Sequence, residues 1–288
     1  MAKIGLVVEG GGMKCAYGAG VLDSFLDHGI TFDYYIGVSA GSANLASFLA
    51  GQRDRNRRYY VEHISDPLYF GLRAYVKTRD LFNLQRIYGD MTNEGGIDPL
   101  DYDAFMAAPG EYEAVATNAL TGEPAYFPKE VMERNNYRHI MASCALPAMC
   151  RPVVIDGVPY FDGGSVDAVP VRRAMERGCD KIVVILSKPR DFVKKPEGHR
   201  RLYTFLCRKY PAVVEALNRR HIMYRGCQDA MFALEREGKA FLYTLETDLK
   251  MSTYTMDADV NQKLYDLGLA DAEEKLPALL EFLGRTQA

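Results

Sequence analysis

The 288-residue sequence has no run of about 20 apolar residues, the length that a membrane-spanning helix needs. The opening MAKIGLVVEGG has one lysine and a few apolar residues before Glu9, so it lacks the apolar core and cleavage site of a signal peptide. A formal net charge of -3 gives no reason to expect nucleic acid as a partner. These absences predict a cytoplasmic globular protein.

Signals for metals, disulfides and nucleotides are also missing. The six cysteines include no CxxC pair and the five histidines are scattered, which argues against a zinc site and a disulfide framework. A dinucleotide-binding GxGxxG on Gly10 and Gly12 would need glycine at position 15, which is Cys15. No GK[ST] phosphate loop is present.

The first 50 residues alternate between strand and helix patterns. An apolar strand at 3–8 is followed by three glycines and a helix at about 13–28, and a second strand at 32–38 runs directly into a second helix. This βαβ unit predicts a parallel sheet and a layered α/β domain. Further along we predict a hairpin, two short helices and a buried strand, at 111–127, 138–144, 170–177 and 181–187.

The composition changes after Lys188, where prolines and basic residues alternate with apolar groups. We place the end of a core domain there, covering residues 1–190. A C-terminal extension, residues 191–288, is predicted to be mostly helical and packed on the core. Its expected elements are a long helix to about Glu237, a strand at 239–247 and a terminal helix at 261–284.

The motif GVSAG, from Gly37 to Gly41, fits GxSxG and lies where the second strand turns into a helix. A nucleophile at such a turn has a strained, exposed backbone, and only glycine fits two residues to either side. The helix N-terminus favours a developing alkoxide. We therefore interpret Ser39 as a nucleophile, against the alternative of a plain N-cap serine.

A serine nucleophile needs donors for the oxyanion that it generates. A right-handed crossover places the ends of the two parallel strands at one sheet edge, so the Gly10–Gly12 turn is expected beside Ser39. The backbone N–H groups of Gly10, Gly11, Gly12 and Met13 then become candidates for an oxyanion hole. The alternative is a purely structural turn. Lys14 is either a solvated lysine or a group that steadies this loop or faces an anionic head group.

The residues alone leave the general base open. No histidine after Ser39 has a local context that marks it as catalytic. A desolvated carboxylate can serve instead, because burial raises its pKa. Asp162 is the best candidate, since it ends an aromatic strand-like segment and precedes Gly163 and Gly164. A surface aspartate in a turn is the competing interpretation.

These motifs together resemble the patatin-like phospholipase family. The resemblance rests on GGGMK (10–14), GVSAG (37–41), ASCALPAMCRPV (142–153) and DGG (162–164), and covers residues 4 to about 187. Two departures are Asp167, where the family often has asparagine, and Lys14, where many members have arginine. The Asp167 charge would either raise the pKa of the dyad or point to solvent.

The resemblance implies a three-layer α/β/α sandwich with a mainly parallel sheet. It also implies a Ser39–Asp162 dyad that works without histidine, metal or organic cofactor, and an acyl-enzyme formed from a lipid ester, such as a phospholipid or lysophospholipid. Alternative functions are acyl transfer by the same nucleophile and a non-catalytic lipid-binding module.

Residues 188–225 contain 11 Lys or Arg and 3 Asp or Glu, interleaved with apolar side chains. Such a segment can lie on an anionic lipid surface, which would place the protein peripherally at the inner membrane face. The alternative is a helix packed on the core with a solvated basic face.

Overall fold

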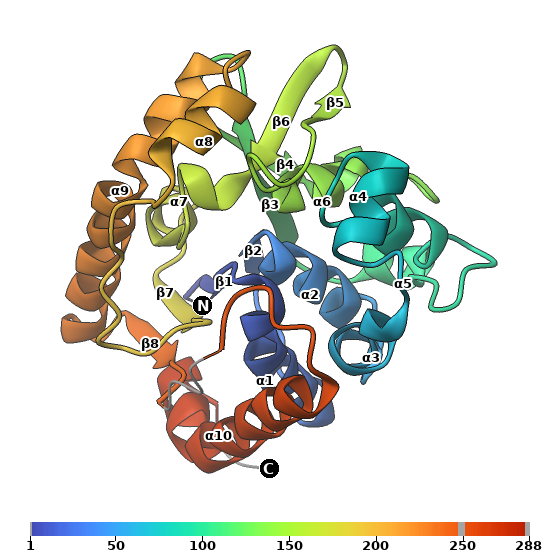
Figure 1. Ribbon diagram of the computed structural model, residues 1–288. Helices are drawn as coiled ribbons and strands as arrows, with labels where there is room; N and C mark the ends of the chain where they lie inside the picture. Colours follow the sequence, from blue (N-terminus) through green and yellow to red (C-terminus); the bar gives the residue numbers. More distant parts are fainter. Residues whose placement is uncertain (1, 247–250, 286–288) are drawn as a thin grey trace.

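A mixed sheet forms the centre of the protein in the computed structural model, which describes residues 2–246 and 251–285 (Figure 1). Within those residues the sheet has eight strands, in the order β5-β6-β3-β2-β1-β7-β8, with β4 paired to β3 outside this path. The strands are β1 Ile4–Val8, β2 Tyr34–Val38, β3 Glu111–Asn118, β4 Pro124–Pro128, β5 Val153–Ile155, β6 Val158–Asp162, β7 Lys181–Ile185 and β8 Ala240–Tyr243.

The central part of the sheet is parallel and its edge is antiparallel. Strand β1 pairs in parallel with β2 and β7, β2 with β3, and β7 with β8. Strand β6 runs antiparallel to both β3 and β5, and β4 runs antiparallel to β3. All five residues of β1 and of β2 are buried, as expected for parallel strands that are covered on both faces.

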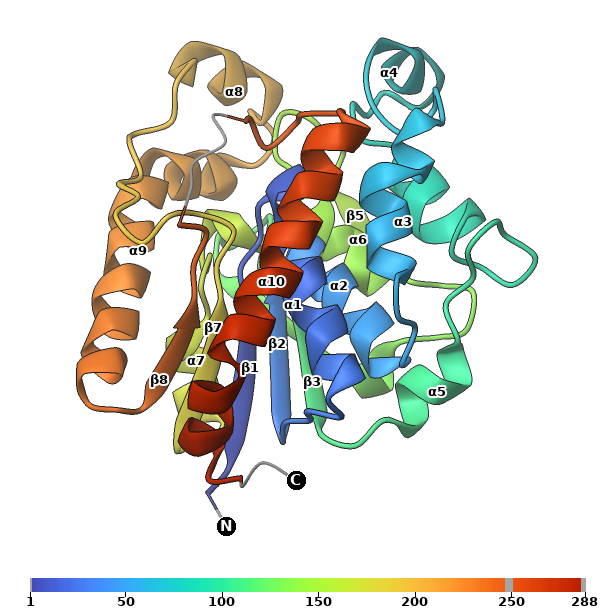
Figure 2. The same cartoon turned by 90° about the horizontal axis from the view of Figure 1, so that it is seen from below.

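Helices cover both faces of the sheet, so the predicted three-layer architecture is confirmed (Figures 1 and 2). One face carries α1 Ala16–Asp27, α2 Ala40–Leu49, α3 Arg55–Val61 and α10 Ala258–Leu283; the other carries α7 Val171–Glu176 and α9 Pro211–Arg236. Alternate β1 residues serve the two cores, Leu6 and Val8 on one side and Val7 on the other.

The remaining helical elements are short. They are η1 Gly12–Cys15, η2 His63–Ser65, α4 Leu72–Thr78, the π-turn η3 Arg86–Asp90, α5 Tyr102–Ala107, η4 Lys129–Val131, α6 Arg138–Cys144, η5 Gly163–Ser165 and α8 Arg200–Leu206. In the part of the chain that the structure describes, no helix combines the length and apolar character needed to cross a bilayer.

The predicted βαβ start, the hairpin of β3 and β4, and the short helices α6 and α7 are confirmed. The C-terminal region is mostly helical, through α8, α9 and α10, as predicted. It also adds β8 to the sheet beside β7. Thr247, the end of the predicted strand at 239–247, lies outside the described residues. The boundary near residue 190 stays a prediction.

Candidate active site

Strand register brings the predicted nucleophile and the predicted base to one row of the sheet. Val38 of β2 pairs with Val115 of β3, so the following residues, Ser39 and Ala116, are neighbours. Ala116 in turn pairs with Asp162 of β6. The backbones of Ser39 and Asp162 are thus separated by two strand spacings across the sheet, roughly 10 Å, a distance that their two side chains can bridge. Both residues line one pocket.

Ser39 occupies the predicted sharp turn between β2 and α2. Its φ of 54° and ψ of -132° lie in a strained region for a residue with a side chain. The Ser143 hydroxyl accepts a hydrogen bond of 2.9 Å from the Ser39 N–H, which holds the turn in place. A Cβ on Gly41 would lie 2.6 Å from the Glu9 carbonyl oxygen, and one on Gly37 2.6 Å from the Ser42 nitrogen. Close packing therefore explains both glycines of the motif.

Asp162 ends β6 and is 3% exposed. Its Oδ1 accepts a 2.7 Å hydrogen bond from the Gly164 N–H, while the buried Oδ2 receives none of standard geometry from the described residues. Burial raises the pKa of Asp162, and the Ser39 hydroxyl and the Arg220 charge partly offset that rise. A buried carboxylate with an unused oxygen and a raised pKa has the properties of a general base.

The glycine loop lies against the nucleophile. A Cβ on Gly10 would be 2.9 Å from the Ser39 Cβ, so only glycine allows this approach. In the described part of the chain, the N–H groups of Gly11 and Gly12 have no hydrogen-bond partner. The Met13 N–H instead donates to the Thr253 carbonyl at 3.0 Å. Of the predicted donors, Met13 is therefore already engaged in this conformation.

Glu9 is a residue of the site that sequence reasoning missed. Its buried carboxylate accepts hydrogen bonds from the Ser187 N–H at 2.8 Å and the Tyr224 hydroxyl at 2.9 Å, and it pairs with Lys188. The Ser187 hydroxyl also donates to the Gly10 carbonyl at 2.8 Å. These contacts fix the start of the glycine loop. The sequence signal for Glu9 is a lone acidic residue between a buried strand and three glycines.

Arg220 of α9 was also missed, and it connects the C-terminal region to the DGG segment. Its Nε donates to the Gly164 carbonyl at 2.6 Å and its Nη1 pairs with Glu197 at 2.9 Å. Gly163, next to it, packs so tightly that a Cβ would lie 2.3 Å from the Val115 carbonyl oxygen. The pocket around Ser39 is lined by four basic residues, Lys14, Lys188, Lys194 and Arg220, and three acidic ones, Glu9, Asp162 and Glu197.

Asp167 fits neither alternative offered by the sequence. Its carboxylate accepts a 2.9 Å hydrogen bond from the Tyr126 hydroxyl and lies 3.8 Å from the Cys227 sulfur. It therefore faces the interior between β4 and α9 instead of solvent, and it is not among the groups with the largest effects on the pKa of Asp162. Burial raises the pKa of Asp167 to about 6.

No histidine is among the described residues that line the pocket around Ser39 and Asp162. His63 contacts Asp98, and His28 contacts Glu273 on α10. Within residues 2–246 and 251–285, no three His, Cys, Asp or Glu side chains are grouped so that they could hold a metal ion. The six cysteines are all buried and unpaired.

A narrow cavity of about 70 Å³ opens from Ser39 along α2. Most of its walls are apolar, with Tyr60, Phe82, Ile87 and Ile140 among the lining side chains. Such a cavity suits a hydrocarbon chain attached to a carbonyl group at Ser39.

Comparison with known proteins shows that two family models match most of the chain. The family model for patatin-like phospholipase matches residues 6–175, and a family described only as a domain of unknown function matches residues 210–284. Uncharacterized protein YjjU of Escherichia coli (strain K12) is 29% identical over 208 residues, which are 71% of this chain and 57% of that protein. This chain thus spans little more than half of that relative.

A solved structure described as VipD from Legionella pneumophila matches with a TM-score of 0.44 and 14% identity, over 95% of this chain and 67% of that one. The match of the phospholipase model extends over more than half of the 288 residues and includes the glycine loop, the GVSAG turn and Asp162. The chain belongs to the patatin-like phospholipase family.

Proposed function

We propose that this protein hydrolyses fatty acyl esters of lipids through Ser39 and Asp162. The single observation that carries the proposal is the site around Ser39. There a strained serine shares a pocket with a buried carboxylate, and no histidine lines that pocket among the described residues. The apolar cavity that starts at Ser39 supports an acyl chain as the bound group.

In the acylation step, Asp162 takes the proton of the Ser39 hydroxyl as the serine oxygen attacks the ester carbonyl. The raised pKa of Asp162 makes it a stronger base than an exposed aspartate. The alcohol leaves after protonation by Asp162, and the acyl group remains on Ser39. Water that Asp162 deprotonates then attacks this acyl-enzyme and releases the fatty acid.

The oxyanion of each tetrahedral intermediate is stabilised by the N–H groups of Gly11 and Gly12. Two such donors are sufficient for an oxyanion hole, and the loss of one typically lowers kcat by about 10²–10³-fold. Met13 would add a third only where the Thr253 carbonyl releases its N–H. Gly10, which touches Ser39, sets the distance between the loop and the nucleophile.

The basic residues of the pocket favour an ester with an anionic head group, as in a phospholipid or lysophospholipid. Lys194 and Arg220 share Glu197, and Lys188 pairs with Glu9, so the anion would meet an already organised charge network. Lys14 lines the same pocket and is a candidate for head-group contact.

The hydrolytic function is tested by fatty acid release from phosphatidylglycerol and lysophosphatidylglycerol in detergent micelles. We expect release by the wild type and none above background with Ser39→Ala. The matched control is Ser65→Ala, because Ser65 lies in η2 outside the pocket. Equal release by the wild type and Ser39→Ala would contradict the proposal.

We further propose that the protein contacts anionic membrane through part of residues 188–225. In α8, Leu202, Phe205 and Leu206 are 57%, 62% and 48% exposed. The neighbouring Arg208 and Lys209 line a groove between α8 and α4. Helix α9, in contrast, buries Val213, Leu217, Tyr224, Cys227 and Met231 in the molecule, so its basic side chains belong to a packed helix. This supports α8 as the lipid-facing part of the segment.

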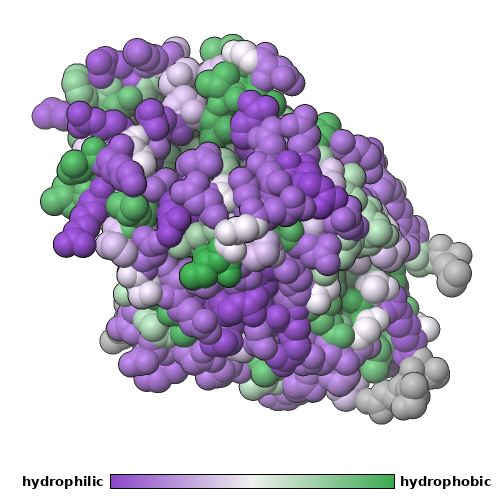
Figure 3. Space-filling view, turned by 90° about the vertical axis from the view of Figure 1, so that its right-hand side faces the viewer, coloured by the Kyte–Doolittle hydropathy of each residue, from purple (hydrophilic) through white to green (hydrophobic). Residues whose placement is uncertain are grey.

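Helix α4 extends the same surface across the groove. Its side chains Leu72, Tyr75 and Val76 are exposed, and Tyr75 and Arg79 line the groove opposite Leu202 and Leu206. Apolar side chains beside cations are the composition expected of an interfacial contact. On the face shown in Figure 3, which carries α3, α4 and α5, hydrophobic residues form small groups separated by polar ones.

A further inference from the structure

The cavity that begins at Ser39 follows one side of α2. Ser39, Ala43 and Ser47 line it at intervals of four residues, which places them in one row along the helix. Ser47 is eight residues beyond Ser39, and a rise of 1.5 Å per residue puts it about 12 Å from the nucleophile. An acyl chain bound in this cavity would therefore have its far end near Ser47.

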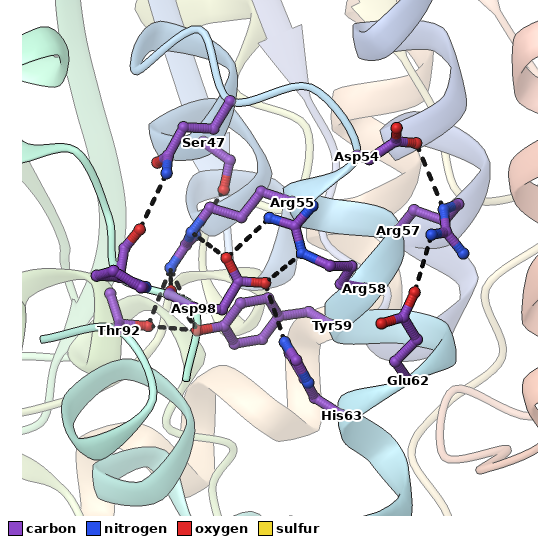
Figure 4. Close-up of polar contacts among 12 residues, drawn as sticks. Ser47, Asp54, Arg55, Arg57, Arg58, Tyr59, Glu62, His63, Thr92 and Asp98 are labelled. Atoms are coloured by element: carbon purple, nitrogen blue, oxygen red, sulfur yellow. Dashed lines mark hydrogen bonds and ion pairs between the residues drawn. The ribbon is translucent and has the colours of Figure 1, made fainter. Parts of the chain in front are cut away.

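The far end of the cavity is polar, in contrast to its walls. Arg55 of α3 reaches it, is 5% exposed, and donates from Nη1 to the Ser47 hydroxyl at 2.7 Å (Figure 4). Its Nη2 donates to the hydroxyl groups of Tyr59 and Thr92, both at 3.2 Å, and to the Asp98 backbone carbonyl at 2.9 Å. The hydrogen-bond partners of this guanidinium are thus neutral groups.

The charge of Arg55 is compensated in part, by an ion pair with the buried Asp98 carboxylate and by the Tyr59 ring, whose centroid lies 4.8 Å from Cζ. The Asp98 carboxylate lies 3.6 Å from its Nε, beyond hydrogen-bond distance, and the Nε–H has no hydrogen-bond partner among the described residues. Asp98 instead binds Arg58 in a bidentate manner, at 2.6 and 2.9 Å, and contacts His63 at 2.9 Å (Figure 4). The single buried carboxylate of Asp98 is therefore the anionic partner of two arginines.

A buried charge is costly unless an opposite charge and hydrogen bonds compensate for it. A structural role would be complete if Arg55 only tied α3 to α2 and to residues 92–98. That role accounts for its bonds to Ser47, Thr92 and the Asp98 carbonyl. It does not account for a cavity-lining cation that shares its one carboxylate with Arg58 and whose Nε–H has no hydrogen-bond partner among the described residues. An anion bound at this end of the cavity would complete the charge compensation of the two arginines.

We propose that the cavity takes acyl chains whose far end carries a carboxylate, which Arg55 binds. The proposal rests on the proposed ester hydrolysis at Ser39 and names half-esters of dicarboxylic acids as preferred substrates of that site. With carbon–carbon bonds of about 1.5 Å in a zigzag, 12 Å corresponds to roughly eight to ten carbons. Arg55 is thus a specificity-determining residue. It acts on the chain end and has no part in the bond-breaking step.

The test compares two fluorophosphonate probes with eight-carbon chains, one ending in a methyl group and one in a carboxylate. The second-order rate of Ser39 labelling is measured by mass spectrometry in the wild type, Arg55→Met and Arg57→Met. Arg57 is the matched control, because it lies two residues along α3 and pairs with Asp54 and Glu62 instead of facing the cavity (Figure 4). Circular dichroism reports whether each variant is folded.

We expect the wild type to react at least about tenfold faster with the carboxylate probe, the size of one charge-assisted hydrogen bond. Arg55→Met should lower this ratio tenfold or more, and Arg57→Met should leave it unchanged. A wild-type ratio of one or less overturns the proposal without reference to any variant, so the proposal stays testable if Arg55→Met does not fold. Equal ratios in folded Arg55→Met and the wild type overturn it as well.

A second measurement separates this proposal from the proposed function. In Ser39→Ala, which cannot react, monomethyl suberate should raise the Tm more than methyl octanoate does at the same concentration. If Ser39 is labelled by neither probe but suberate still stabilises, hydrolysis fails and the chain-end site stands. If Ser39 is labelled without preference and suberate does not stabilise, the chain-end site fails and hydrolysis stands.

Discussion

Asp167 shows how a single buried carboxylate can link pH to stability. Burial raises its pKa to about 6 from the ordinary value of 3.8, although the Tyr126 hydroxyl donates to it. Because the folded-state pKa lies above the unfolded one, the folded state binds a proton more tightly in the window between about 4 and 6. Protonation therefore stabilises the fold as the pH falls through 6, and the charged form costs stability above it.

We predict that Asp167→Asn raises the free energy of unfolding at pH 8 by on the order of 1–3 kcal/mol, because the amide is neutral and still accepts the Tyr126 hydrogen bond. The gain should vanish below pH 4. Urea denaturation at pH 8, 6 and 4 measures it, with Asp229→Asn on the exposed side of α9 as the control. A gain of the same size at all three pH values would contradict this account of the burial.

Arg220 acts on the candidate base through charge. Its guanidinium lies at the DGG segment, where it donates to the Gly164 carbonyl, and its charge lowers the pKa of Asp162. A general base is active only when deprotonated, so activity is lost as the pH falls through its pKa.

We predict that Arg220→Met moves the acidic limb of the kcat/KM profile to higher pH. A pH series on a soluble p-nitrophenyl ester measures the shift, and Arg219→Met, an exposed arginine on the same helix, should leave the limb in place. A lower kcat/KM with an unmoved acidic limb would show that Arg220 only holds the loop.

At the scale of elements, the features that can be predicted from the sequence are those marked by a short local pattern of residues. An apolar run predicts β1, and glycines next to a functional side chain predict the GVSAG turn and the DGG segment. The close approaches at Gly37 and Gly41 show why the GVSAG turn needs its glycines. Strand register then brings Ser39 and Asp162 together. Register is set by pairing over the whole sheet, which a single sequence does not display.

The parts that sequence analysis missed depend on distant contacts. Glu9 meets Ser187 across 178 positions, and Arg55 meets Asp98 across 43. No residue pattern near Glu9 or Arg55 indicates these partners, since an isolated charged side chain is usually exposed to solvent. Strand β8 was predicted, but its pairing with β7, which joins the C-terminal region to the central sheet, was not.

Helix α8 is the element in which the basic segment and exposed apolar side chains coincide. We predict that replacing Leu202, Phe205 and Leu206 with glutamine lowers binding to anionic vesicles several-fold, because each change removes apolar area that would enter the interface. Co-sedimentation with phosphatidylglycerol vesicles at low and high salt measures the binding.

Hydrolysis of a soluble ester should stay at the wild-type level in the triple variant, since α8 is not part of the pocket around Ser39. Leu120→Gln, an exposed residue in the turn between β3 and β4, is the control. Equal recovery of the wild type with neutral and anionic vesicles would argue against an electrostatic membrane contact.

At the scale of the whole molecule, the C-terminal region completes the site that the first 190 residues begin. Tyr224 and Arg220 of α9 contact Glu9 and the DGG segment, and Thr253 covers the glycine loop. The family model for phospholipases ends at residue 175, so these contacts come from residues beyond it. The proposed chemistry therefore depends on the folded chain as a unit.

The most direct test of the central claim is the rate at which a fluorophosphonate labels Ser39 in the wild type, Asp162→Asn and variants of each histidine. We expect labelling of Ser39 in the wild type, a loss of about 10²–10⁴-fold in Asp162→Asn, and wild-type rates in the histidine variants. A labelling rate in Asp162→Asn equal to that of the wild type, or a large loss in any one histidine variant, would contradict a serine activated by Asp162 alone.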